Sequence, residues 1–528
     1  MNSLVLNSLR TRTRFAWMLL PALVLLLAGS VSAKDPSLGT QPNIVLIMVD
    51  DMGWSDLGCY GSEIETPHID SLAADGLLFT DFYNNGKCTT TRASLLTGRY
   101  PQRGGRGIEL LDDRMRTIAE RLLQMGYRTG MSGKWHNGKV KPHRPIDRGF
   151  EESFGLWDGC CNFFDPSQPD PAFKGGRVRF FGRNDKRIDD FPDDFYSTDA
   201  FTDHAIETIR DAVGSGTPFF HYLAYTAPHY PLHAKPSDIA KYRGRYDAGW
   251  DVLRKKRYQR QVDLGLIDPA VWPDPGPNPN NQDFKRDDLV DEAWEMSRME
   301  VYAAMLDCVD QNIGRLLQTL DELKVAENTL IVFLSDNGGC AEVPGGAANT
   351  THRPGPKQWY SHVGPNWAYA QNTPFRRYKT YTHEGGIATP CVMRWPAIIS
   401  PGQKSRTVGH IIDLLPTFVD LAGGTINQPD AGPERLPVDG ISLSPVLRDP
   451  KSTLPRQNAL FWHWAGHRAV RDGKWKAVWE NKKQGWELYD LGDDRTETQN
   501  LAAKYPDRVN QYANAWLGWA KQTGVRVR

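Results

Sequence analysis

Short apolar runs alternate with amphipathic stretches through most of the chain. Residues 44–49 (IVLIMV) are entirely apolar, and the runs 219–225 and 329–334 have a similar character. Such strands are typical of a sheet that is covered by helices on both sides. Segment 302–320 instead repeats apolar residues at three- and four-residue spacing, which predicts a long amphipathic helix. Together the two patterns predict an α/β fold with a large mixed sheet flanked by helices.

The tail of the chain has a different pattern. Residues 467–479 contain two strand-like runs around an Asp-Gly pair, which predicts a β-hairpin. Residues 506–523 place Val, Tyr and two Trp residues on one side of a predicted helix. We therefore expect a large domain over residues 34–424, which would hold the active site. A smaller C-terminal domain over residues 425–528 would consist of an antiparallel sheet and a helix.

The first 33 residues have the composition of a secretory signal peptide. Three arginines precede the apolar run 15–28, and a Val-Ser-Ala triplet ending at Ala33 makes a small-residue cleavage site. We predict a signal peptide over residues 1–33 and an exported protein, periplasmic or secreted, with no membrane attachment after cleavage. A retained membrane anchor is the alternative, but the run is shorter than the roughly 20 apolar residues that a membrane-spanning helix needs.

Charge and cysteine content narrow the functional classes. The chain has 63 basic and 63 acidic residues, so its net charge gives no reason to expect nucleic acid or a membrane surface as a partner. Any affinity for anions must therefore be local. Seven cysteines leave one without a partner in an exported protein. If Cys88 is that one, the other six could form three disulfides, although nothing in the sequence requires them.

Polar clusters follow four of the predicted strands. In open α/β sheets, functional side chains gather beyond the carboxyl ends of the strands, so these clusters would lie close together. Asp50 and Asp51 follow the run 44–49, and Lys134 and His136 follow a fourth strand-like run at 129–132. His229 follows the run 219–225, and Asp336 and Asn337 follow the run 329–334. Two Asp-rich strand ends offer hard oxygen ligands, which suit Ca²⁺ or Mg²⁺ and not zinc. Taken singly, each acidic cluster could equally be a turn or a helix cap, but buried carboxylates without a cation are unfavourable.

A cysteine stands at the start of one predicted helix. The segment Cys88-Thr89-Thr90-Thr91-Arg92 follows the strand-like run 77–80 and leads into Ala-Ser-Leu-Leu-Thr-Gly-Arg, which can form a helix. Backbone N–H groups and the positive end of the helix dipole make such a start suitable for anion chemistry. A buried cysteine beside a surface arginine is the simpler interpretation of these five residues alone. Lys379, in the basic segment 373–379, is a further candidate for binding an anion.

The segment around Cys88 resembles the signature of the type I sulfatases of the alkaline phosphatase superfamily, which is C-x-(P/S/A)-x-R followed by a helical tail. Thr90 stands where that family has Pro, Ser or Ala. The resemblance extends from about residue 43 to residue 421 and implies an alkaline phosphatase/sulfatase-like fold. It also implies that a maturation enzyme, of the formylglycine-generating kind or an equivalent, oxidises Cys88 to formylglycine. The metal ligands that it implies are Asp50, Asp51, Asp336, Asn337 and the formylglycine at Cys88.

The same resemblance implies a sulfuric ester hydrolase that cleaves the S–O bond of sulfate esters. Arg92 and Lys134 would hold and polarise the formylglycine, and His136 would lie beside its second hydroxyl. His229 and Lys379 would contact the sulfate and the leaving oxygen. The cation would be Ca²⁺, with Mg²⁺ as the alternative. The substrate would be an aryl sulfate, another sulfated small molecule or a sulfated glycan.

Two other functions stay open on the sequence alone. One is a formylglycine-dependent phosphomonoester or phosphonate hydrolase. The other is a non-catalytic relative that binds sulfated glycans and keeps Cys88 unmodified. Two loop segments, 156–183 and 342–371, would meet the rest of the substrate, because their aromatic and basic side chains suit sugar rings that bear sulfate or carboxylate groups. Packing of these aromatic side chains onto the core is the alternative.

Overall fold

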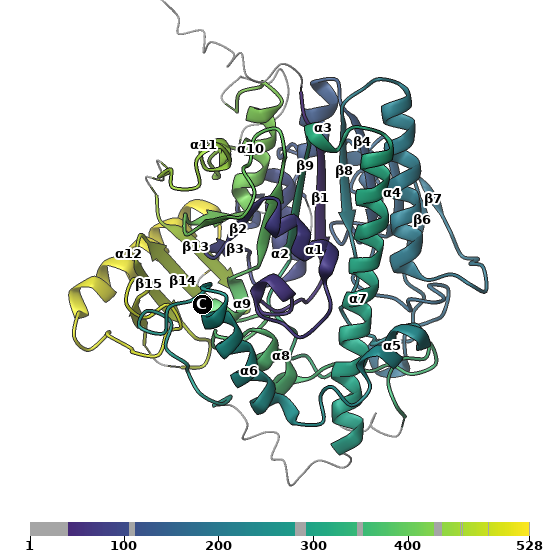
Figure 1. Cartoon of the computed structure of the whole chain (residues 1–528). Coiled ribbons are helices and arrows are strands. Elements are labelled where there is room, and N and C mark those ends of the chain that lie inside the picture. The colour runs from purple at the N-terminus through teal and green to yellow at the C-terminus, as the bar shows by residue number, and fades with distance from the viewer. Residues whose placement is uncertain are drawn as a thin grey trace, which may run out of the picture. The chain divides into compact units, whose positions relative to one another are not determined.

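A mixed sheet of ten strands organises the structure (Figure 1). Its strands are β1 (Asn43–Val49), β2 (Leu77–Phe79), β4 (Arg128–Gly133), β5 (Glu152–Leu156), β6 (Phe181–Arg183), β7 (Lys186–Arg187), β8 (Phe219–Ala224), β9 (Thr329–Ser335), β10 (Cys391–Arg394) and β11 (Gln403–Ser405). Their order in the sheet is β11-β2-β10-β9-β1-β8-β4-β5-β6-β7. Strand β1 pairs in parallel with β8 and β9, whereas β10 runs antiparallel to β9. The predicted large mixed sheet is therefore confirmed.

This computed structural model describes residues 41–104, 111–279, 292–345, 352–426, 436–454, 456, 458–483 and 485–526. The predicted signal peptide over residues 1–33 lies outside the described residues and stays a prediction. Among the helices that are described, none has both the length and the apolar character needed to cross a bilayer. All seven cysteines are free thiols in this structure.

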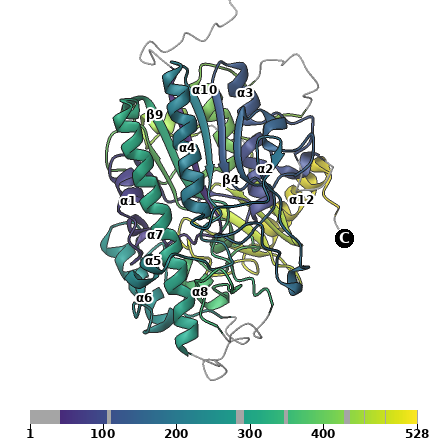
Figure 2. The same cartoon turned by 90° about the vertical axis from the view of Figure 1, so that its right-hand side faces the viewer.

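Helices cover both faces of the sheet (Figure 2). They are α1 (Pro67–Ala74), α2 (Cys88–Thr97), α3 (Ile118–Gln124), α4 (Ser197–Gly214), α5 (Pro236–Tyr242), α6 (Gly249–Asp263), α7 (Glu292–Glu322), α8 (Pro365–Gln371), α9 (Glu384–Ile387), α10 (Leu414–Leu421), α11 (Ser444–Arg448) and α12 (Pro506–Thr523). Helices α1, α4 and α7 lie on one face, and α2, α3 and α10 lie on the other. The predicted helix over 302–320 is part of α7, and its apolar residues are buried because they face the sheet and its neighbouring helices.

A second, antiparallel sheet forms after the large one. Its strands are β13 (Leu460–Trp464), β14 (His467–Asp472), β15 (Trp475–Trp479) and β16 (Glu487–Asp490), paired in chain order. The predicted hairpin is β14 and β15, joined by the Asp-Gly turn. Helix α12 packs on this sheet, where the indole of Trp516 donates a hydrogen bond of 3.0 Å to the carbonyl of Trp462. Strand β3 (Phe82–Tyr83) pairs separately with β12 (Gly409–His410). The division of the chain at residue 424 stays a prediction.

A buried ionic network joins the C-terminal sheet to the loops of the large sheet. Lys476 on β15 pairs with Glu384 at 2.6 Å and with Glu497 at 2.8 Å. Arg495 pairs with Asp81 at 3.1 Å and also with Glu384. Burial alone would raise the pKa of Glu384, but Arg495 and Lys476 outweigh it and lower this pKa to about 2. The charged form of Glu384 therefore contributes to stability.

We expect acid to remove this contribution. The folded pKa of Glu384 is about 2 and its ordinary value is 4.5, so the contribution is fully present above pH 4.5 and is lost as the pH falls toward 2. The difference corresponds to about 3 kcal/mol of unfolding free energy. Denaturant unfolding of the wild type and of Glu384→Gln should be measured at several pH values. The difference in unfolding free energy between the two proteins, which we call the stability gap, should become smaller below pH 4.5. A gap that is independent of pH would contradict this assignment.

Candidate active site

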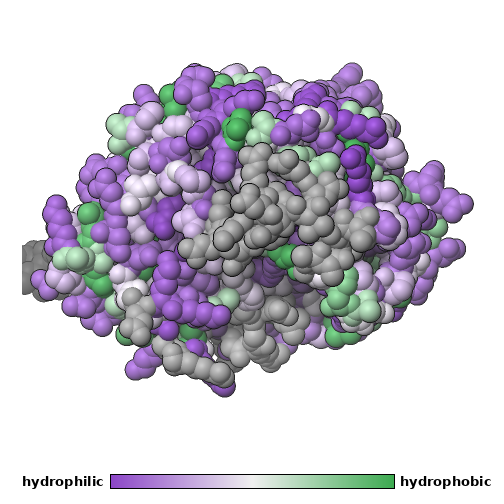
Figure 3. Space-filling model, turned by 90° about the horizontal axis from the view of Figure 1, so that it is seen from below, coloured by the Kyte–Doolittle hydropathy of each residue, from purple (hydrophilic) through white to green (hydrophobic). Residues whose placement is uncertain are grey.

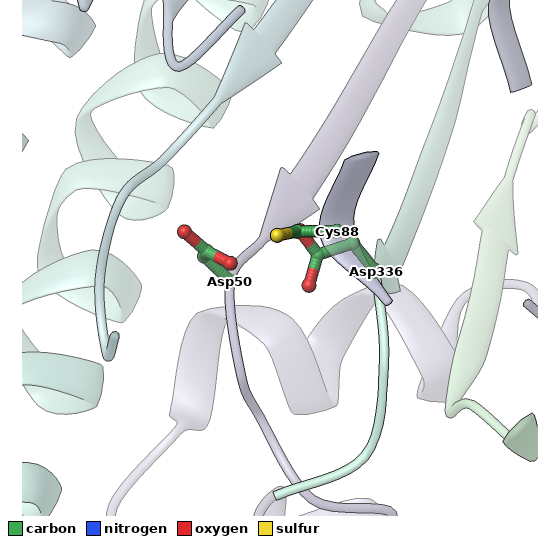
Figure 4. Close-up of side chains that lie close together, drawn as sticks. All are labelled: Asp50, Cys88 and Asp336. Carbon is green, nitrogen blue, oxygen red and sulfur yellow. The ribbon is translucent and has the colours of Figure 1, made fainter. Parts of the chain in front are cut away.

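The carboxyl ends of the central strands bring the predicted site residues together. Val49 on β1 is aligned with Ser335 on β9, so Asp50 and Asp336 emerge side by side from adjacent parallel strands. Cys88 approaches them from the start of α2 (Figure 4). One ligating atom each of Asp50, Cys88 and Asp336 lies within 4.8 Å of the other two. Figure 3 shows the molecule from the side toward which β1 and β9 run, and its visible surface is mainly hydrophilic with scattered hydrophobic residues.

Cys88 is the first residue of α2 and is almost completely buried. The hydroxyl of Thr90 donates a hydrogen bond of 2.9 Å to the carbonyl of Lys87, and the hydroxyl of Thr91 accepts one of 3.0 Å from the backbone N–H of Asn85. Both threonines thus tie the helix start to the preceding loop. Burial raises the pKa of the Cys88 thiol, although Lys134 acts in the opposite direction.

Four oxygen-bearing side chains form the acidic part of the site. Asp50, Asp51, Asp336 and Asn337 are buried. Among the described residues, Asp50 Oδ1, Asp51 Oδ2 and Asn337 Oδ1 have no hydrogen-bond donor. Burial, together with the neighbouring carboxylate of Asp336, raises the pKa of Asp50 well above its ordinary range. Buried oxygens without donors and crowded carboxylates fit a hard divalent cation, since the alternative is a large desolvation penalty.

Each of the three carboxylates also has a cationic neighbour. Lys134 Nζ donates to Asp50 Oδ2, and Arg92 binds Asp336 Oδ2 through Nε at 3.0 Å and through Nη2 at 2.7 Å. Lys379 Nζ lies 2.6 Å from Asp51 Oδ1. Because these cations point into the same buried region, an anionic group that enters it would meet positive charge from several directions.

The two predicted histidines lie in the same region. His229 Nδ1 donates a hydrogen bond of 2.5 Å to the carbonyl of Tyr230, and its Nε2 lies 3.4 Å from Asp51 Oδ2. His136 has left-handed backbone torsions, and its ring fills the space beside Gly159, where a Cβ would lie only 2.7 Å from the imidazole. Burial and nearby lysines lower the pKa of both rings well below the ordinary value, so both are neutral at pH 7.

Comparison with protein families decides the family to which this chain belongs. The family model described as "Sulfatase" matches residues 42–424, which is more than half of the chain. A second model, "N-sulphoglucosamine sulphohydrolase, C-terminal", matches residues 376–514. The chain belongs to the sulfatase family. It is accordingly a sulfuric ester hydrolase, and its large sheet with a C-terminal four-stranded sheet is the architecture of its structural neighbours.

Individual relatives resemble this sulfatase along most of its length. An uncharacterised sulfatase of Schizosaccharomyces pombe is 35% identical over 92% of this chain and 94% of its own. An arylsulfatase of Klebsiella aerogenes is 33% identical over 80% of this chain and 95% of its own. The crystal structure of Ps i-CgsB in complex with k-i-k-neocarrahexaose is 28% identical, covers 92% of this chain and 94% of its own, and has a TM-score of 0.67.

The structure places one further acidic residue, which sequence reasoning did not single out, beside the candidate site residues. Glu342 accepts hydrogen bonds from Lys87 Nζ at 2.9 Å and from the hydroxyl of Tyr230 at 2.5 Å, and it lies 3.9 Å from Lys379 Nζ. These contacts lower the pKa of Glu342 even though burial alone would raise it, with Lys379 as the largest opposing influence. No sequence pattern marks this residue, because its partners come from three separate segments of the chain.

The two loop segments that we expected at the rim contain both buried and exposed side chains. Trp367 is buried and donates a 3.0 Å hydrogen bond to the carbonyl of Glu295, and His362 is buried against Arg298. These two side chains therefore pack onto the core, as the alternative interpretation predicts. Phe173 and Trp359, in contrast, are among the exposed large apolar residues.

Proposed function

We propose that this sulfatase cleaves the S–O bond of sulfate esters with a formylglycine nucleophile derived from Cys88 and a divalent cation, Ca²⁺ or Mg²⁺. The observation that carries the proposal is the buried thiol at the start of α2, within 4.8 Å of the ligating oxygens of Asp50 and Asp336. The oxygens that lack donors suit the cation, which Asp50, Asp51, Asp336, Asn337 and the modified residue 88 would hold. When bound, the cation would favour ionisation of the nucleophile and offset the charge of the sulfate.

The remaining side chains have roles that follow from their charge and position. Arg92 is fixed by Asp336 and by the carbonyl of Lys134 at 2.9 Å, so its charge stays directed at the region of residue 88. Lys134 adds a second positive charge there. Lys379 would stabilise or protonate the departing oxygen, and His229, which faces Asp51 together with Lys379, would contact the sulfate. His136, neutral at pH 7, would accept the proton from the second hydroxyl of the formylglycine hydrate and so allow release of sulfate.

Sulfated carbohydrates or aryl sulfates are the substrates that we propose. The Klebsiella aerogenes relative is named an arylsulfatase, and Ps i-CgsB was crystallised with a carrahexaose. The predicted signal peptide supports an exported enzyme that meets such substrates outside the cytoplasm, after its maturation by a formylglycine-generating or equivalent enzyme. Sequencing the N-terminus of the purified protein tests the export proposal, which requires a mature start at Lys34.

Parallel turnover of 4-nitrophenyl sulfate and 4-nitrophenyl phosphate by the same preparation tests the reaction class. We expect the sulfate ester to be hydrolysed with the higher kcat/KM. A higher kcat/KM for the phosphate ester would instead favour a phosphomonoester or phosphonate hydrolase. A non-catalytic glycan-binding relative would be favoured by two results together. Neither ester would be hydrolysed, and Cys88 would have an unmodified thiol in protein from the native host.

Divalent ions are expected to stabilise the folded protein. A ligand that binds only the native state at 100 times its Kd adds about 2.7 kcal/mol to the unfolding free energy. Protein stripped with a chelator should therefore unfold at a lower temperature than protein with added Ca²⁺. Asn337→Ala removes one of the oxygens that lack a donor, so its thermal shift on adding Ca²⁺ should be smaller. Equal shifts for the variant and the wild type would contradict a role of Asn337 as a ligand.

A further inference from the structure

One short turn brings an unpaired cation close to the active site. The turn Ala172–Lys174 places Lys174 Nζ 4.8 Å from the ring centre of Tyr230 and 5.9 Å from that of Tyr360. Tyr230 in turn contacts His229, with ring centres 4.0 Å apart, and its ring centre lies 6.0 Å from Lys379 Nζ. Lys174 is thus separated from two of the proposed catalytic side chains by a single aromatic ring.

Lys174 differs from the other lysines in this region in the groups that surround its ammonium. Lys379 lies 2.6 Å from Asp51, and Lys87 lies 2.9 Å from the partly exposed carboxylate of Glu342. Lys174 has no carboxylate partner within the parts of the chain that the structure describes. Its contacts with the faces of two aromatic rings fix its position without neutralising it. A fixed, unpaired cation beside an anion site is suited to a second anionic group.

An exposed aromatic ring stands next to this cation. The side chain of Phe173 is 49% exposed, and its ring meets that of Tyr360 edge-on with centres 5.6 Å apart. A Cβ at Gly345 would lie 3.0 Å from the Phe173 ring, so the lack of a side chain there leaves room for the ring. The hydroxyl of Tyr230 donates a hydrogen bond of 2.5 Å to Glu342, which holds the ring of Tyr230 in place beside Lys174. An exposed aromatic face beside a fixed cation suits an anionic sugar.

We propose that Phe173 and Lys174 form a subsite for a second anionic group of the substrate, so that the enzyme prefers sulfated saccharides carrying a further sulfate or carboxylate. This inference rests on the proposed function, because the scissile sulfate must occupy the site around residue 88. Lys174 would bind the second anion by charge-assisted hydrogen bonds, and Phe173 would contact the apolar face of the sugar ring. Both are specificity residues, since neither contacts the side chains proposed for catalysis.

Competitive inhibition of 4-nitrophenyl sulfate hydrolysis by matched saccharides tests the subsite. One pair is glucosamine 6-sulfate and glucosamine 2-N,6-O-disulfate, and another is N-acetylgalactosamine 6-sulfate and the chondroitin 6-sulfate disaccharide, which adds a carboxylate. In the wild type we expect the second anion to lower Ki by about tenfold in at least one pair. Lys174→Met should abolish this preference, and Lys174→Arg should retain it. Inorganic sulfate serves as the reference inhibitor that lacks a second anion.

Lys186→Met is the matched control, because Lys186 is an exposed lysine on β7 and should keep the wild-type preference. Thermal unfolding of each variant would show whether Lys174→Met acts by destabilising the fold. The proposal is overturned if no pair shows a preference in the wild type, or if Lys174→Met keeps it. Failure of the proposed function gives a different result from failure of the subsite proposal alone. In the first case the wild type would not hydrolyse 4-nitrophenyl sulfate at all, and both proposals would be wrong.

Discussion

Replacement of Cys88 by alanine is expected to lower kcat/KM for 4-nitrophenyl sulfate by about four orders of magnitude or more. The reason is chemical, since alanine cannot be oxidised to an aldehyde and so offers no nucleophile at the start of α2. The variant should stay folded, because the thiol is buried but small. Steady-state kinetics and a thermal unfolding curve measured on the same preparation separate loss of chemistry from loss of structure.

Cys308→Ala is the matched control for this experiment. Cys308 is also a buried free thiol, but it lies on α7, where its sulfur is 3.7 Å from Asp199 Oδ1. Its replacement should therefore leave kcat/KM close to the wild-type value while removing a thiol of the same kind. Retention of a large part of the wild-type activity by Cys88→Ala would remove residue 88 from the mechanism.

Replacement of Asp336 by alanine should have the second largest effect. Asp336 supplies one ligating oxygen to the proposed cation site and also holds Arg92 by two hydrogen bonds. Its loss removes negative charge from the cation site and takes from the buried Arg92 its nearer carboxylate partner, leaving Asp50 at 4.0 Å as the remaining one. Removing one partner of a buried ion pair costs about 3–5 kcal/mol. We expect kcat/KM to fall by about three orders of magnitude and Ca²⁺ no longer to raise the unfolding temperature.

Asp413→Asn tests whether the effect of Asp336 is only one of stability. Asp413 is likewise buried and pairs with an arginine, Arg456, but it caps a 3-10 turn far along the chain from the proposed ligands. This variant should lose stability and still bind Ca²⁺ and hydrolyse the ester when folded. If Asp336→Ala kept both the thermal shift with Ca²⁺ and its turnover, Asp336 would not be a ligand.

The parts of this structure that could be predicted are those governed by local pattern. The apolar run of β1 required burial on both faces, and the carboxyl ends of parallel strands necessarily meet at one edge of the sheet. The juxtaposition of Asp50 and Asp336 followed from these two facts. In contrast, Lys379 lies 43 positions after Asp336, and only the family resemblance indicated that it would face Asp51.

The sequence could not decide where loop side chains would lie. Trp367 and Phe173 are both aromatic residues of long loops, yet one packs in the core and the other is exposed. Whether each side chain is buried or exposed depends on contacts with segments far away in the chain, such as α7 for Trp367 and Gly345 for Phe173. Strand β13 was likewise missed, because its pairing with β14 and its packing against α12 define it more than its own pattern does.

Mass spectrometry of residue 88 tests the central claim most directly. Trypsin cleaves after Lys87 and after Arg92 and so releases the peptide Cys88–Arg92. In active enzyme purified from its native host, we expect this peptide to be about 18 Da lighter than its unmodified mass and not to react with iodoacetamide, because an aldehyde replaces the thiol. A fully active preparation whose peptide has the unmodified mass and a reactive thiol would contradict the account.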